Sequence, residues 1–238
     1  MALLNKNRKS SISEKGLARY LVYAVGEIIL VVIGILIAVS INDWQENKKE
    51  EKLLKTYLKD YRNDLLVDST MVGINLRMLE QRDEGFKMVM SDTLKREDLF
   101  ENPITFNLIT TYNPVKLQSK GYNELLSYVG KNETKKDSLI QNIIASHSAY
   151  NELLEMAMKN ISEDIADNMR YLKNNKPWIG RLMTGKLDEE ITDYFLSIDY
   201  QNRSAVHATL VFGNLQVFLK QYKAYIEEVL PKIEERIN

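Results

Sequence analysis

The sequence predicts an all-α protein in which one N-terminal transmembrane helix continues into an extramembrane helical bundle. Residues 21–41, LVYAVGEIILVVIGILIAVSI, form an uninterrupted apolar run. Beyond this run, apolar residues recur at steps of three and four, which is the period of one helix face. No glycine or proline lies between Gly34 and Gly73, so the membrane helix is expected to run directly into the first helix of the bundle.

The apolar run has the length of a membrane span. At about 1.5 Å rise per residue it covers roughly 30 Å, the thickness of the hydrocarbon core of a bilayer. Tyr20 and Tyr23 at one end and Trp44 at the other are the aromatic side chains expected at the two membrane interfaces. A cleaved signal peptide is the alternative, but its apolar core is usually about 7–15 residues long and ends in a small-residue cleavage site. This run is longer and ends in Asn42-Asp43-Trp44, so we expect a retained anchor.

The charges on the two flanks of the span set its expected orientation. Lys and Arg are equally numerous on both flanks, so their number alone does not orient the helix. The N-terminal basic cluster is nearly free of acidic residues, whereas glutamates alternate with the lysines that follow the span. We therefore predict a basic cytoplasmic tail at residues 1–19, a transmembrane helix at 20–44 and an extracytoplasmic α-helical bundle at 45–238.

The extramembrane region is predicted to contain three long helices and several short ones, which bury their apolar stripes against one another. The first extends from Gln45 to about Met90, and residues 91–115 form a loop with at most short helical pieces because Asn-Pro dipeptides disfavour helix. Pro231 is expected to bend or break the last helix. The other helices are predicted at 116–128, 135–172, 188–197 and 202–229. The buried stripe of the first helix is predicted as Leu54, Tyr57, Leu58, Tyr61, Leu65, Val72, Leu76 and Leu79.

Residues 19–44 carry three short motifs in a fixed order. These are Gly26-Glu-Ile28, Gly34-Ile-Leu-Ile-Ala38 and Asn42-Asp-Trp44. The combination resembles the N-terminal signature of a family of uncharacterised single-span membrane proteins common in Bacteroidota. The segment Leu117-Gln-Ser-Lys-Gly-Tyr122 also resembles a Leu-x-Ser-x-Gly segment in the middle of that family. The resemblance implies a bacterial inner membrane protein with a periplasmic body, and it implies no activity.

Glu27 is the one charged residue inside the apolar run 21–41. A carboxylate at this depth costs about 2.5 kcal/mol or more unless it is protonated, paired or hydrated. At about 100° per residue it shares a helix face with Gly34 and Ala38, a pair of small residues that allows membrane helices to approach closely. We interpret Glu27, Gly34 and Ala38 as a helix-association face for a homo-oligomer or a partner membrane protein. The alternative is that Glu27 transfers protons or cations.

Composition excludes several classes of site. The chain has no cysteine, which removes disulfides and thiolate chemistry, and its formal net charge of −1 does not suit a nucleic-acid partner. The two histidines, His147 and His207, are interpreted as ordinary surface or partly buried residues, and acidic pairs such as Glu163-Asp164 as solvated helix faces. We find no catalytic, cofactor-binding or metal-binding motif and predict none.

These observations favour a membrane-anchored helical interaction module without chemistry of its own, such as a scaffold, a sensor or an accessory subunit of an envelope complex. Its predicted partners are the lipid bilayer and another copy or another membrane protein. Two alternatives remain open. One is an ion-pathway or motor-associated subunit that uses Glu27, and the other is an envelope enzyme with a site near residues 112–122.

Overall fold

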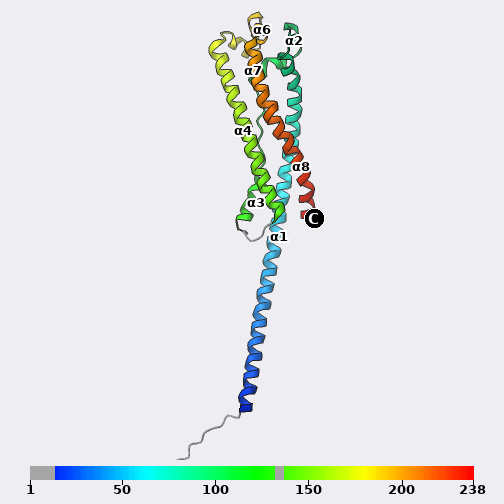
Figure 1. The fold of residues 1–238 in the computed structure, drawn as a ribbon, viewed down its shortest axis with the longest axis vertical. Helices are drawn as coiled ribbons and strands as arrows, with labels where there is room; N and C mark the ends of the chain where they lie inside the picture. The colour runs from blue at the N-terminus through cyan, green and yellow to red at the C-terminus, as the bar shows by residue number, and fades with distance from the viewer. Residues whose placement is uncertain (1–13, 132–136) are drawn as a thin grey trace, which may run out of the picture. The chain divides into compact units, whose positions relative to one another are not determined.

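The computed structural model describes residues 14–131 and 137–238, and all regular structure in these ranges is helical (Figure 1). The prediction of an all-α protein is confirmed. Residues 1–13, most of the predicted basic tail, lie outside the described residues, and so does position 135, where one helix was expected to begin. The elements are α1 (Glu14–Val89), α2 (Arg96–Glu101), η1 (Pro103–Asn107), α3 (Lys120–Lys131), α4 (Ser138–Asn175), α5 (Ile179–Met183), α6 (Glu189–Phe195), α7 (Ile198–Ala208), η2 (Thr209–Leu215) and α8 (Gln216–Ile237).

Helix α1 passes through residues 42–54 without a break. The absence of glycine and proline predicted this continuity, and the prediction is confirmed. By their internal contacts the residues form two compact units, Met1–Leu53 and Leu54–Asn238. The first unit therefore contains only the N-terminal part of α1 among its described residues, and the second contains the rest of α1 and all the other helices.

In the first unit, α1 exposes its apolar side chains on every side. The large apolar residues from Leu21 to Ile41 are exposed, as is Trp44. In the part of the chain that the structure describes, α1 is the one helix that is long and apolar enough to cross a membrane, judged by length and composition. A helix that is apolar all round belongs in a bilayer or in the interior of an assembly rather than in water.

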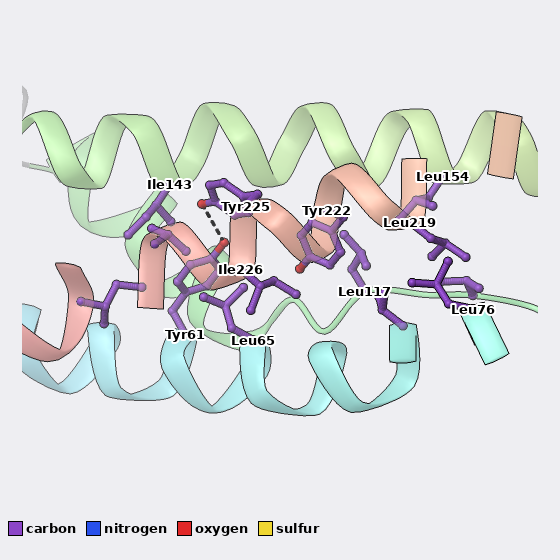
Figure 2. Close-up of a cluster of buried hydrophobic side chains, with 14 of the residues drawn as sticks. Tyr61, Leu65, Leu76, Leu117, Ile143, Leu154, Leu219, Tyr222, Tyr225 and Ile226 are labelled. Atoms are coloured by element: carbon purple, nitrogen blue, oxygen red, sulfur yellow. Dashed lines mark hydrogen bonds between the residues drawn. The ribbon is translucent and has the colours of Figure 1, made fainter. Parts of the chain in front are cut away.

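The main core of the second unit forms where α1, α4 and α8 pack together (Figure 2). Leu117, from the segment before α3, joins the side chains of these three helices. The predicted stripe of α1 is confirmed, since all of its members are buried except Tyr57, which is partly buried. Central members of this core are Tyr61, Leu65, Leu76, Ile143, Leu154, Leu219, Tyr222, Tyr225 and Ile226.

A second apolar cluster joins the C-terminal turns of α1 to the short elements α2, η1, α5, α6 and α7. Its centre is aromatic. The rings of Phe195 and Tyr200 lie 4.6 Å apart, edge to face, and Phe106 meets Phe195 in the same way at 4.8 Å. Such edge-to-face pairs add to the stabilisation by burial. The short elements α2, η1, α5, α6 and α7 are therefore held by one shared aromatic core.

Two of the short helices differ from the prediction. Helix α3 begins at Lys120 rather than at residue 116, because the N–H groups before it bond to side chains of α1, as described below. The corner after α4 contains a helix that was not predicted, α5, whose flanking Trp178 is buried in the second cluster. A five-residue helix is too short to show a periodic apolar pattern, so the sequence carried no signal for it.

The last predicted helix is interrupted in the structure. Residues 209–215, η2, form a π-helix between α7 and α8, which a search for a single 3.6-residue period cannot detect. Pro231 does not break the helix, because α8 continues past it to Ile237; the alternative, that it bends the helix end, stays a prediction. Val229 and Ile233 are both buried on either side of Pro231, and their packing holds the helix in place across it.

Candidate functional site

Three aspartates on α1 contact the start of α3 or the segment just before it, Asp60 through an ion pair with Lys120 at 3.1 Å. Asp60, Asp64 and Asp68 are spaced four residues apart, so they lie along one side of the helix. Asp68 Oδ1 accepts the backbone N–H of Gln118 at 3.0 Å, and Asp64 Oδ2 accepts that of Gly121 at 2.7 Å. The N-terminus of α3 is thus capped by carboxylates from another helix, which explains where α3 begins.

Gly121 lies directly against the backbone of α1. A Cβ atom at this position would stand 2.2 Å from the backbone N of Tyr61 and 2.3 Å from its Cα. No side chain can move aside to make room, because both atoms belong to the main chain. The close approach of α3 to α1 therefore requires glycine at this position.

Asp68 is the one carboxylate of this group that is fully buried. Its other oxygen, Oδ2, accepts the hydroxyl of Tyr222 at 2.7 Å, so both oxygens are bonded. Burial raises the pKa of Asp68 to about 6, and the hydrogen bonds from Gln118 and Tyr222 oppose that rise. A perturbed carboxylate can mark an active site, but this one is 1% exposed. The geometry is that of a buried anchor between α1, α8 and the segment before α3.

The prediction that the two histidines are surface or partly buried residues is wrong. His147 on α4 is 2% exposed and His207 on α7 is 0% exposed. The ring of His147 stacks on Tyr122 with centroids 4.3 Å apart, and Tyr61 packs edge-on against it at 5.7 Å. Burial lowers the pKa of His147 to about 4. His147 therefore acts as a neutral aromatic core residue.

His207 belongs to a polar cluster inside the bundle. Its Nδ1 lies 2.7 Å from Asp164 Oδ2, which also accepts the side-chain amide of Asn168 at 2.9 Å. The side-chain oxygen Oδ1 of Asn168 in turn accepts a hydrogen bond from Nη1 of Arg203 at 3.1 Å. Asp164 was predicted on a solvated face, and that prediction is wrong because its carboxylate is mostly buried against α7.

Arg82 connects α1 to the same region. Its guanidinium donates to the carbonyl of Leu108 at 2.7 Å and to the carbonyl and hydroxyl of Thr111, both at 3.1 Å. The loop after η1 is thereby fixed to α1. Arg82 and His207 also line a common small cavity beside the π-helix η2, together with Val211 and Leu215.

Comparison with known proteins finds a family match to part of the chain. Residues 27–115 match the model of a family described as "Family of unknown function (DUF6090)". The matched segment includes the described part of α1 from Glu27 onward, α2 and η1, and it ends before α3. The match supports an uncharacterised domain, as the resemblance implied, while the bacterial group and the N-terminal signature remain predictions. No curated protein and no solved structure matches the chain.

The residues that the sequence singled out all lie on α1 in the first unit. Tyr20, Tyr23 and Trp44 are exposed, and Lys48 places its ammonium group 4.0 Å from the Trp44 ring. A Cβ atom added to Gly34 would meet no heavy atom within 4 Å, so this position is open. Glu27 and Ala38 are exposed as well. The face formed by Glu27, Gly34 and Ala38 is thus accessible in the single chain, and its role stays a prediction.

A second accessible face lies on α1 within the bundle. Leu66, Val67, Ile74 and Met78 are 40–54% exposed, and we call these four residues the outer row. A shallow groove of about 400 Å³ is lined by three members of the row, Leu66, Val67 and Ile74, together with Thr70, Met71 and Asn75, and none of these residues is charged. This face could not be predicted from the sequence, because periodicity identifies the buried stripe of α1 and leaves open which of the remaining faces is uncovered.

One feature of the sequence could have revealed the carboxylate anchor. Asp68 continues the buried stripe, three residues after Leu65 and four before Val72. A carboxylate at a stripe position must find hydrogen-bond donors when the helix packs. The donors could not be identified from the sequence, because Gln118 and Tyr222 lie 50 and 154 residues away.

Proposed function

We propose that this protein is a membrane-anchored helical interaction module, which serves as a scaffold, a sensor or an accessory subunit and has no chemistry of its own. The outer row is the observation that carries the proposal. Val67 and Ile74 each follow a buried residue by two positions, a rotation of about 200°, so they face away from the core of their own unit. An exposed apolar face on a charge-rich helix is typical of a protein–protein contact.

The membrane anchor of this proposal is the apolar part of α1, and we place it in a bacterial inner membrane with the N-terminus in the cytoplasm and the body in the periplasm. Its length and its all-round apolar surface support a span. The support for the orientation is the distribution of charges on the two flanks. An anchor confines the body to a layer next to the membrane, which raises its effective concentration toward partners in the same membrane.

The outer row can be tested with a pair of valines of similar exposure. Val67 in the row is 54% exposed, and Val206 on α7 is 58% exposed. We expect Val67→Asp to weaken the native complex at least about tenfold, because the contact would have to bury an unpaired charge. Val206→Asp should leave the complex intact. The measurement is blue-native electrophoresis of the full chain extracted in mild detergent, with mass spectrometry of co-purifying proteins.

Two outcomes of that experiment would contradict the proposal. A wild-type chain that migrates as a monomer without co-purifying protein would remove the interaction itself. Equal assembly of the Val67→Asp and Val206→Asp variants would show that the outer row is not the contact. Circular dichroism of both variants checks that the helical fold is kept.

The predicted helix-association face of Glu27, Gly34 and Ala38 has its own test, which also addresses the ion-pathway alternative. Gly34→Leu should block close approach of helices and dissociate a complex formed through this face, because membrane helices associate through small residues. Glu27→Gln should leave assembly intact, since an amide keeps most hydrogen bonds of a protonated carboxyl. Wild-type assembly of Gly34→Leu would exclude this face. Normal assembly of Glu27→Gln with loss of the cellular phenotype would favour an ion pathway.

The alternative of an envelope enzyme near residues 112–122 finds one supporting observation. Asp68, which contacts Gln118 in that segment, has a pKa raised to about 6. Its burial and its two bonded oxygens argue against direct contact with a substrate. We therefore rank this alternative below the interaction module.

A further inference from the structure

We infer that the outer row binds an amphipathic helix of another protein, one whose apolar stripe is flanked by carboxylates. The inference rests on the proposed function, since it names the chemistry of the partner that would occupy this contact. It follows from the shape of the row and from the charges on its two sides.

The outer row has the shape of a helix-binding surface. Val67, Ile74 and Met78 follow one another at steps of seven and four residues, and the exposed, uncharged Thr70 lies between the first two. These spacings place the side chains in one straight stripe of about three turns. The apolar face of a partner helix has the same spacing and can pack along this stripe, ridges into grooves.

Arg77 lies at one edge of the row. It follows Thr70 by seven positions, which is about two turns, so both side chains lie along the same line of α1. The side chain of Arg77 is exposed, and it makes no ion pair or hydrogen bond with any residue that the structure describes. A positive charge at this edge is therefore available to a partner.

Lys116 lies on the opposite side of the row. The segment before α3 runs along α1 there, because the side-chain amide of Asn113 donates to Met78 Sδ at 2.9 Å and the N–H of Gln118 donates to Asp68 at 3.0 Å. Lys116 lies between these two contacts. Its two chain neighbours are buried, whereas its own side chain is exposed and unpaired within the described ranges. The row thus has a cation on each side.

The carboxylates nearest to the row do not cancel these charges. Asp60, Asp64 and Asp68 are turned toward α3 and the segment before it, as described above. Glu80 follows the last residue of the row by two positions, a rotation of about 200°, and so lies on a different side of α1. On α8 the glutamates as far as Glu234 each lie within 4.0 Å of a basic side chain. The border of the row is therefore basic, and its complement is acidic.

A second copy of this chain fits the row less well. Two copies anchored in one membrane run parallel, so Arg77 of each copy would face Arg77 of the other across the contact. Like charges set against each other oppose association. A partner helix with carboxylates in these places gains attraction where a second copy meets repulsion.

The test uses two synthetic helical peptides of about 18 residues, long enough to cover the row. They share one leucine stripe, and the residues that flank the stripe are glutamate in the first peptide and lysine in the second. Binding of each labelled peptide to the full chain in phosphatidylcholine nanodiscs is measured by fluorescence anisotropy, with empty nanodiscs as the background. We expect the glutamate peptide to bind at least about fivefold more tightly at low salt, and the difference to shrink at about 0.5 M salt.

One pair of variants tests the apolar row itself. Val67→Asp should weaken binding of the glutamate peptide about tenfold or more, because it sets a like charge in the middle of the apolar contact. Val206→Asp, on α7, should leave this binding unchanged. Circular dichroism confirms that both variants keep the helical fold.

A second pair tests the charges beside the row. Arg77→Glu combined with Lys116→Glu should reverse the preference, so that the lysine peptide binds more tightly than the glutamate peptide. Lys173→Glu combined with Lys186→Glu changes the net charge by the same amount, on α4 and in the segment after α5. This control should keep the preference of the wild type.

Four results would overturn the inference. They are no binding of the glutamate peptide at about 1 mM, where even weak contacts are populated, equal binding of the two peptides, a preference that survives the charge reversal, and a wild-type dimer in light scattering that Val67→Asp dissociates. The last result would show that a second copy occupies the row.

Failure of this inference can be told apart from failure of the proposed function, which is read from the native complex. If Val67→Asp disrupts the native complex while the two peptides bind equally, the row is a contact but its partner is not acidic. If the peptides discriminate while the native complex is insensitive to Val67→Asp, the proposed function fails and the acidic preference of the row stands.

Discussion

Replacement of Gly121 by alanine should destabilise the second unit by about 3 kcal/mol or more, at the upper end of the cost of forcing extra atoms into a packed interior. The new Cβ would stand 2.2 Å from the backbone N of Tyr61. To avoid this clash, α3 must move away from α1. That movement lengthens the hydrogen bond from Gly121 N–H to Asp64 and separates Leu125 from the core. The cost therefore includes lost packing and lost capping as well as steric overlap.

Gly130 provides the matched control, because it lies on the same helix and a Cβ atom there would meet nothing within 4 Å. Gly130→Ala should be neutral or stabilise by up to about 1 kcal/mol through helix propensity. Thermal unfolding of the full chain in detergent, followed by circular dichroism, compares the two variants. For a protein of this size the Gly121→Ala loss corresponds to a fall of about 6–12 °C in Tm. Equal Tm values for the two variants would contradict the close approach of α3 and α1.

Acidification should destabilise the protein through His147. The folded state lowers the pKa of this ring from its ordinary value of 6.5 to about 4 because the ring is buried. Above pH 6.5 the ring is neutral in both the folded and the unfolded state. Between pH 6.5 and 4 the unfolded chain binds a proton that the folded chain does not, so stability falls as the pH falls. The full loss, reached below pH 4, is about 3 kcal/mol.

His147→Phe isolates this effect, since phenylalanine can keep the stack on Tyr122 and has no ring nitrogen to protonate. The quantity to compare is the difference in unfolding free energy between wild type and variant, measured by urea denaturation at several pH values from 7.5 to 4. This difference removes the contributions of the other titrating groups. His207, whose pKa is lowered, also makes the protein less stable as the pH falls. Asp68, whose pKa is raised, makes the protein more stable as the pH falls. A difference that stays constant from pH 7 to 4 would show that His147 is not a neutral core residue.

Features that depend on residues close together in the sequence were predicted correctly, whereas features that depend on packing between distant helices were not. The stripe of α1 could be predicted because burial of one helix face imposes a period on the sequence itself. The π-helix η2 and the passage of α8 through Pro231 could not, since packing against other helices decides both. The predicted site residues on α1 follow from local chemistry in the apolar run and at its two ends. The outer row was not predicted because its residues differ in no local property from other apolar helix residues. Only the packing of the core shows which face of α1 stays uncovered.

The sequence by itself determined the helical class, the apolar span and the continuity of α1, because hydrophobic periodicity, run length and the absence of helix-breaking residues are local properties of the chain. Only the tertiary structure decided which polar residues are buried and what they bind. Asp68 meets Tyr222 across 154 residues, and Asp164 meets His207 across 43. No local pattern encodes such pairs. They form because the packing of the helices removes these side chains from water, so each must bond to the polar groups that the fold brings next to it.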